Sequence, residues 1–309
     1  MRKTRRTGID KLHTLLFGQD LRITEGEPYC QVRPFDFAAD FEPRHLTKPL
    51  PAPVGEVIDI RTFGADSAAE DNAVAVQQAV DAAAKVGGTV LVDGGSYPMS
   101  TVELRSGVTL FIAPGSFLAA RPDGKGFSHK ALLYGRDLTN VTLTGGGGLE
   151  GEGHRFGLRP ALPQNCTKPA NLIDVIEMRR TYRAQLRFAH PSKYGGLLCL
   201  EQCQGVHIHH FLFQNSAHWT CRLQMCRDVL VEYAAIRNNR NVANADGFDI
   251  VGGQDLTFRH CMVSTADDGF VFKHAVWLGS SGEMHHILVE DCRVDSRTNC
   301  IKIGTETTY

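Results

Sequence analysis

The sequence predicts an all-β protein, a single-stranded parallel β-helix with a capping helix near its N-terminus. One strand pattern recurs four times without gaps, and only one segment has the periodicity of a helix. The chain also has 31 glycines in 309 residues, above the ~7% of an average protein and without the strict period of collagen. A solenoid explains all three observations, because its short strands stack coil on coil and turn at glycine-rich corners.

Composition narrows the classes of partner. Apolar residues make up 42% of the chain and charged residues 22%, which is typical of a globular protein and excludes wholesale disorder. The 33 Lys and Arg nearly balance the 34 Asp and Glu, so we expect neither a nucleic-acid nor a membrane partner bound through a basic surface. The nine cysteines include no paired CxxC motif, so we expect no metal, no cofactor and reduced thiols.

The two ends of the chain carry further expectations. The apolar run over residues 12–17 is too short and too polar for a signal peptide, which predicts a cytoplasmic protein, or a secreted or periplasmic one if the start is misassigned. No stretch approaches the ~18 apolar residues of a membrane span. The last predicted strand ends close to Tyr309, so we expect a chain truncated at its C-terminus, monomeric, with an uncapped end open to association.

The expected domain boundary lies near Gly55. Residues 1–54 are heterogeneous in composition and end in a proline-rich connector over residues 48–53. We therefore expect an N-terminal extension and linker over residues 1–54 and a β-helix domain over residues 55–309.

The first elements of this domain are a strand, a turn and the helix. Residues 57–60 have the composition of a short strand, and residues 63–66 that of a turn. From Asp71, the expected N-cap, apolar residues recur every three or four positions as far as Gly87-Gly88, which predicts one helix. Such a helix can cover the unpaired strand edges that an open β-helix end exposes.

The strands that follow, beginning with residues 89–92, repeat one pattern. Alternate side chains of each repeat are apolar, so each repeat buries one face and needs stacked neighbours to complete a core. The gap-free segments are 205–213, 228–236, 255–263 and 286–294. Their aligned apolar columns are Val206, Val229, Leu256 and Ile287, then Ile208, Val231, Phe258 and Val289, then Phe213, Ile236, Val263 and Val294.

Each repeat has a second strand a short turn after the first. One residue of each second strand is expected to point inward, and the residue two positions earlier to lie in a vertical file at the strand entrances. A propeller or a leucine-rich repeat is disfavoured, because the sequence has neither a blade signature nor a repeated helix. The second strands are 219–223, 246–250, 268–272 and 299–303. The inward residues are Cys221, Phe248, Phe270 and Ile301, and the file is Trp219, Asp246, Asp268 and Asn299.

Three acids converge where two of these second strands begin. Asp246 and Asp268 occupy equivalent places on successive coils, about 5 Å apart, and Asp267 directly precedes Asp268. At an effective dielectric of ~20, two carboxylates at that distance repel by roughly 3 kcal/mol, or about two pKa units. We therefore expect the cluster to hold a proton at neutral pH beside a charged base, as acid/base catalysis requires. The alternative is turn chemistry, in which each aspartate bonds its own corner; Asp249 is expected to be a solvated acid that points outward.

The motifs around these acids resemble those of the polygalacturonase-like enzymes, glycoside hydrolase family 28. The segment NSAHWT at 215–220 is similar to the family's NSPxWT, NADG at 244–247 to NTDG, and ADD at 266–268 to GDD. The segment FGAD at 63–66, with the helix and GGTVLV after it, resembles the family's opening. The resemblance begins near Ile58 and implies a right-handed parallel β-helix of the pectin-lyase type.

The resemblance also implies an activity and roles for the acids. Asp267 would protonate the glycosidic oxygen, while Asp246 and Asp268 would hold and deprotonate the attacking water, with inversion at the anomeric carbon. The implied enzyme is a glycosidase that cleaves a pectin-type chain, galacturonan or rhamnogalacturonan-like. Its expected partner is therefore an acidic or pectic oligosaccharide.

Further residues near the acids are expected to bind the substrate. The family's GHG motif falls at Thr298-Asn299-Cys300, where asparagine replaces histidine, and its RIK motif has no counterpart, so pectic chains other than plain polygalacturonan are equal candidates. Lysines at solvent-facing strand positions are expected to neutralise a uronate, and an aromatic ring to stack on a sugar. The predicted substrate-binding residues are Asn244, His218, Trp219, Lys273, Asn299, Lys302 and Glu306.

Two other functions stay open at this point. A pectate-lyase-like eliminase would need further acidic ligands for Ca²⁺ and a cationic base, and the three aspartates supply neither, so hydrolysis is favoured. A non-catalytic carbohydrate-binding β-helix would bind the sugar and turn over no substrate.

Overall fold

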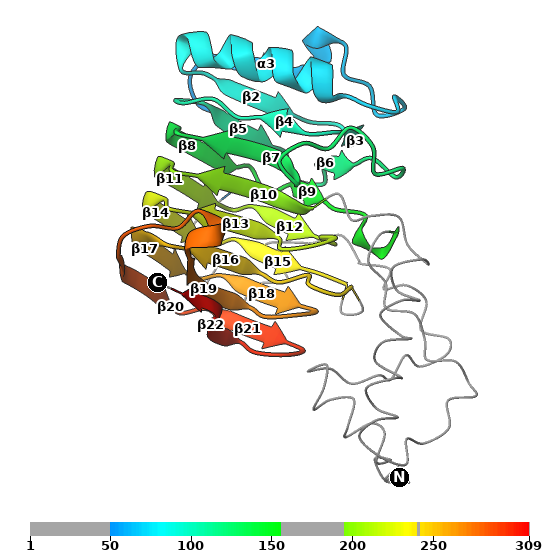
Figure 1. The fold of residues 1–309 in the computed structure, drawn as a ribbon. Helices are drawn as coiled ribbons and strands as arrows, with labels where there is room; N and C mark the ends of the chain where they lie inside the picture. The colour runs from blue at the N-terminus through cyan, green and yellow to red at the C-terminus, as the bar shows by residue number, and fades with distance from the viewer. Residues whose placement is uncertain (1–49, 156–194, 240–241, 309) are drawn as a thin grey trace, which may run out of the picture.

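The chain folds as a stack of short parallel strands, with one helix across its N-terminal end (Figure 1). The computed structural model describes residues 50–155, 195–239 and 242–308. Each complete coil contributes one strand to each of three sheets, named A, B and C in the order in which the chain visits them. The predicted all-β solenoid, a right-handed parallel β-helix, is confirmed.

All neighbouring strands within the three sheets pair in parallel. Sheet A consists of β1 (Val57–Asp59), β2 (Thr89–Val92), β5 (Thr109–Ile112), β8 (Thr139–Thr144), β11 (Gln204–His209), β14 (Arg227–Glu232), β17 (Gly253–Arg259) and β20 (Met284–Glu290). Sheet B consists of β3 (Ser96–Met99), β6 (Phe117–Ala120), β9 (Gly148–Glu150), β12 (Leu212–Gln214), β15 (Ala235–Arg237), β18 (Met262–Thr265) and β21 (Arg293–Ser296). Sheet C consists of β4 (Val102–Glu103), β7 (Ala131–Arg136), β10 (Gly196–Glu201), β13 (Cys221–Gln224), β16 (Phe248–Val251), β19 (Phe270–Ala275) and β22 (Ile301–Thr308).

The register of the sheets confirms the repeat inferred from the sequence. Every predicted apolar column consists of residues that stand opposite one another on successive strands. The columns begin at Val206 and Ile208 in sheet A, Phe213 in sheet B and Cys221 in sheet C. Because each coil stacks directly on the preceding coil, residues at equivalent corners of successive coils lie close together.

One α-helix is present among the described residues, α3 (Ala73–Val86), alongside three short 3₁₀ turns, η2 (Ile60–Phe63), η3 (Gly153–Arg155) and η4 (Val276–Leu278). The N-cap position is Asn72, so the predicted cap at Asp71 is one residue too early. The Asp71 carboxylate still accepts the Ala73 N–H at 2.9 Å, because a side chain one residue further out can reach the first free donor. The helix ends as predicted at Gly87, whose φ of 62° favours glycine.

Three phenylalanines fill the interior beside the B-to-C corner. The rings of Phe248 and Phe270 stack with centroids 5.2 Å apart, and Phe258 lies 5.1 and 5.4 Å from them. All three side chains are fully buried. Since Phe248 and Phe270 begin β16 and β19, their packing fixes the backbone just after Asp246 and Asp268.

The last coil differs from the others in exposure. Ile301 is in register with Phe270, yet 57% of its side chain is exposed. The predicted burial of Ile301 is therefore wrong, because β22 is the outermost strand of sheet C in the described chain and nothing there covers it. Ile303 on the same strand is 82% exposed.

Two other expectations concern the periphery. The predicted extension over residues 1–54 lies outside the described residues except for residues 50–54. The seven cysteines within the described ranges are free thiols. No helix in the described part of the chain has the length and apolarity needed to cross a membrane.

Candidate active site

The acids gather at the corner where the chain passes from sheet B to sheet C. Asp246 lies two residues before β16, and Asp267-Asp268 lie just before β19. Coil stacking aligns them, since the Gly247 N–H donates to the Asp268 carbonyl at 2.8 Å. One carboxylate oxygen from each acid lies within 4.8 Å of the other two. The structure thus brings together the three aspartates that the sequence predicted as catalytic.

Asp268 is held as a carboxylate by three donors. Lys302 Nζ donates to Oδ2 at 2.6 Å, while Thr298 Oγ1 and Asn299 Nδ2 each donate to Oδ1 at 2.7 Å. The side chain is 2% exposed. Burial acts to raise its pKa, but the Lys302, Thr298 and Asn299 hydrogen bonds outweigh burial and leave the pKa below its ordinary value. Asp268 is therefore charged at neutral pH and suited to accept a proton.

Asp246 has the opposite environment. Its side chain is 3% exposed, and its Oδ1 is buried without a hydrogen-bond partner among the described residues. Burial first, and then the charges of Asp249 and Asp267, raise the pKa of Asp246 well above its ordinary value. Two carboxyls at one corner thus favour opposite protonation states, which is the arrangement that acid/base chemistry uses.

Asp267 is the most accessible of the three acids. Its side chain is only partly buried, and its Oδ1 lies 3.2 Å from the Thr298 hydroxyl. The backbone carbonyl of Asp267 accepts hydrogen bonds at 2.6 Å from the hydroxyls of Thr265 and Ser296. Two successive coils therefore fix this corner, while the carboxyl stays within reach of a ligand.

A buried ion network lies beside the acids. Lys273 Nζ is 3.4 Å from Asp249 Oδ1, 3.1 Å from Glu306 Oε2 and 3.9 Å from the centre of the Trp219 ring. Asp249 is fully buried, and burial raises its pKa to about 7 against the opposing charge of Lys273. The expected solvation of Asp249 and the solvent-facing placement of Lys273 are both wrong, because the outward-pointing side chains cover each other.

Three other predicted substrate-binding residues contact groups of the site itself. Asn299 and Lys302 both donate to Asp268, and Glu306 pairs with Lys273. In this structure their polar groups orient an acid or a buried cation.

The remaining predicted residues lie around the acids. Asn244 is exposed on a turn, with φ 57°, two residues before Asp246. His218 and Trp219 stand one coil away, with ring centroids 5.4 Å apart. Because Lys273 covers one face of the Trp219 indole, a sugar can stack only on the remaining surface of that ring.

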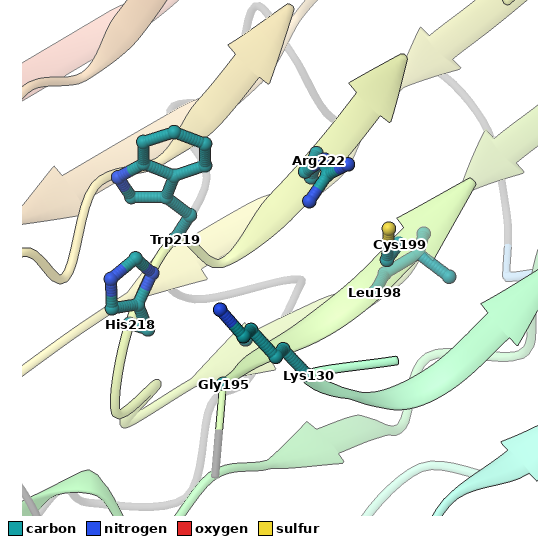
Figure 2. Close-up of a pocket in the computed structure, with 8 residues that line it drawn as sticks. Lys130, Gly195, Leu198, Cys199, His218, Trp219 and Arg222 are labelled. Atoms are coloured by element: carbon teal, nitrogen blue, oxygen red, sulfur yellow. The ribbon is translucent and has the colours of Figure 1, made fainter. Parts of the chain in front are cut away.

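A pocket of about 370 Å³ adjoins Trp219 on the side away from the acids (Figure 2). Figure 2 shows Lys130 reaching toward the side where His218 and Trp219 lie, with Arg222 further along the strand. The pocket is contributed by the starts of β7, β10 and β13. Its lining residues are Lys130, Gly195, Gly196, Leu198, Cys199, His218, Trp219 and Arg222.

Three residues of this region, Thr298, Lys130 and Arg222, were not predicted from the sequence. A signal existed for Thr298, because extending the register of β19 and β22 places it beside Asp267 on the next coil. No such signal existed for Lys130, which lies on a coil outside the four aligned segments.

The acid corner is the only group of three or more His, Cys, Asp or Glu side chains among the described residues whose ligand atoms converge. The ammonium of Lys302 already lies 2.6 Å from Asp268 Oδ2. Since a divalent ion would have to share that oxygen with a cation, the donor set is a poor fit for a metal.

Replacing Lys302 by methionine is expected to move the acid limb of the activity profile to higher pH. Asp268 loses its cationic donor, so its lowered pKa rises, and the base is protonated at pH values where the wild-type base is charged. The check is kcat/KM against pH. Lys302→Arg keeps the cation and should retain the wild-type limb; an unshifted limb in Lys302→Met would show that Asp268 is not the base.

Fold and site together define the class: a β-helical glycosidase, with acids clustered on the outside of a parallel solenoid. A family model described as Glycosyl hydrolases family 28 matches residues 85–275. The match covers more than half of the chain, and the chain belongs to this family. No curated protein sequence matches it.

Solved structures share the fold at low identity. An exopolygalacturonase from Thermotoga maritima is 19% identical with a TM-score of 0.64, over 84% of this chain and 65% of its own. A family 28 exopolygalacturonase from Yersinia enterocolitica is 17% identical with a TM-score of 0.63, over 81% of this chain and 51% of its own. A Parabacteroides merdae protein is 21% identical with a TM-score of 0.58, over 77% of this chain and 96% of its own. This chain thus spans about half to two thirds of the two exopolygalacturonases.

Proposed function

We propose that the protein is a glycoside hydrolase that cleaves a pectin-type chain, galacturonan or rhamnogalacturonan-like, by acid/base catalysis at the aspartate corner. The observation that carries this proposal is that two acids of the same corner lie in different environments. Asp268 accepts three hydrogen bonds, while Asp246 is buried with an unpartnered oxygen. Family membership supports a glycosidase reaction.

In this mechanism Asp267 donates its proton to the glycosidic oxygen, because it is the acid that a substrate can reach. Asp268, charged in the free enzyme, accepts a proton from the attacking water. Asp246 holds that water from the other side through its carboxyl. The bond from the anomeric carbon to the leaving oxygen breaks as the bond to the water oxygen forms.

We further propose that the reaction inverts the anomeric configuration. The resemblance to the family carries this proposal, because it implies inversion, and the chain belongs to that family. The spacing of less than 4.8 Å is closer to the ~5–5.5 Å of retaining pairs than to the ~6.5–9.5 Å of inverting ones. Inversion is compatible with it if the water lies beside the pair of acids rather than between them.

The test is the release of products from homogalacturonan and rhamnogalacturonan fragments, with the configuration of the new reducing end read by NMR at early times. We expect the configuration opposite to that of the cleaved bond. Retained configuration would overturn inversion, and ultraviolet-absorbing unsaturated ends would indicate an eliminase. No product from any fragment would overturn the hydrolase proposal.

A further inference from the structure

We propose that the pocket beside Trp219 is a subsite for the carboxylate of a uronic acid residue, with Lys130 as the charge that binds it. The inference rests on the proposed function and names a charged sugar on the Trp219 side of the cleaved bond. It differs from the sequence-based expectation, which gave this role to Lys273 and Lys302.

The position of the pocket follows from the stacking of coils. The Thr220 N–H donates to the Asp246 carbonyl at 3.2 Å, so Trp219 and Asp246 are neighbours in one file. Successive coils are ~4.8 Å apart, about the length of one sugar residue in an extended chain. A chain laid along the file with its cleaved bond at the acids therefore passes over Trp219, one coil away, and continues toward Gly195 and Lys130, which lie two and three coils away.

Two glycines of the pocket lie where neighbouring coils approach closely. Gly196 stands opposite Ala131, and a Cβ at Gly196 would collide with the Trp219 carbonyl. A Cβ at Gly195 would collide with the Lys130 carbonyl. The backbones of neighbouring coils therefore approach too closely here for any residue but glycine, and neither position adds a side chain to the lining of the pocket.

The charge of the pocket suits an anion. None of the described lining residues is acidic, and Lys130 is exposed and forms no ion pair with a described residue. Arg222 adds a second positive charge, partly balanced by Glu201 at 3.0 Å. The Cys199 thiol stays neutral, because burial raises its pKa to about 12. A carboxylate entering here meets the Lys130 ammonium, which forms no ion pair with a described residue, and charge-assisted bonds of this kind are strong.

The other cations near the acids are already in use. Lys302 donates to Asp268 at 2.6 Å, and Lys273 is 5% exposed between Asp249 and Glu306. Pairing either one with substrate would leave a buried carboxylate uncompensated, which is costly. Lys130 can bind a uronate without breaking an ion pair with any described residue.

The experiment measures binding without turnover. In full-length Asp267→Asn protein, calorimetric titration with α-1,4-digalacturonate is compared with titration by its neutral methyl ester. We expect the acid to bind more tightly, and Lys130→Met in that background to weaken the acid by about tenfold, as for loss of one charge-assisted hydrogen bond. The ester should be unaffected, and Lys130→Arg should restore most of the affinity.

Lys125→Met is the matched control, since Lys125 is an exposed lysine close by in the sequence that does not line the pocket. Equal weakening by Lys125→Met and Lys130→Met, or equal binding of acid and ester, would overturn the subsite. Hydrolysis of pectic fragments with binding insensitive to Lys130 would overturn the subsite alone. Charge-selective binding that needs Lys130, without hydrolysis of any fragment by the wild-type protein, would overturn the proposed function and leave the subsite standing.

Discussion

Replacing Asp267 by asparagine is expected to lower kcat/KM on the cleaved pectic oligosaccharide by about 10²- to 10⁴-fold, the usual contribution of a general acid. The amide has nearly the same shape but no acidic proton. Its neighbours cannot take over, because Asp268 is held charged by three donors and Asp246 is 3% exposed. The measurement is the initial rate of reducing-end release by wild-type and variant protein.

Asp291→Asn is the control for this loss. Asp291 is exposed at an A-to-B corner with φ 48°, a conformation that asparagine adopts as readily as aspartate. The same chemical change there should leave the rate intact. Turnover by Asp267→Asn equal to that of wild type would contradict the assigned acid and would favour a carbohydrate-binding solenoid over an enzyme.

The leaving group offers a second readout of the same substitution. An aryl glycoside with an acidic phenol needs little protonation to depart, so Asp267→Asn should lose far less rate on it than on an oligosaccharide. A variant that was merely misfolded would lose rate on both. The ratio of the two losses therefore separates the loss of a proton donor from the loss of structure.

The pKa values of Asp246 and Asp268 shift in opposite directions because different residues lie beside them. Asp268 stands below Asn299 in the file and within reach of Lys302, so donors of the last coil stabilise its charge. Asp246 stands next to Trp219 and near the buried Asp249, so burial and like charge disfavour its anion. Two aspartates at equivalent positions of adjacent coils thus favour different protonation states, because their neighbouring residues differ.

Much of this could be predicted from the sequence, because a β-helix converts alternation along the chain into contact between coils. The columns that begin at Val206 and Cys221, and the meeting of Asp246 with Asp268, follow from aligning the repeats. Once the register is known, it also shows which corner residues of adjacent coils lie next to one another. The acids were therefore found together with the fold.

What could not be predicted is what lies over an outward-facing side chain. Alternation places Asp249 and Lys273 outside the solenoid, but it does not reveal that they bury each other against Trp219 and Glu306. The reach of long side chains decides such contacts. The lining of the pocket depends in addition on Lys130, which comes from a coil outside the four aligned segments.

Replacing Phe248 by alanine is expected to lower the free energy of unfolding by about 3 to 5 kcal/mol, as for other buried phenylalanines. The side chain is fully buried and stacks on Phe270 at 5.2 Å and against Phe258 at 5.1 Å. Neighbours on three strands cannot collapse into the gap without shifting the coils. The measurement is urea unfolding followed by circular dichroism.

Leu288→Ala is the comparison, because Leu288 is 48% exposed on β20 and its loss should cost under about 1 kcal/mol. Phe248 also begins β16 two residues after Asp246. A relaxed coil would move that carboxyl relative to Asp268, so Phe248→Ala should reduce kcat under conditions where the variant is still folded. Equal stability losses in the two variants, or full activity in folded Phe248→Ala, would mean that the aromatic stack does not hold the acids in place.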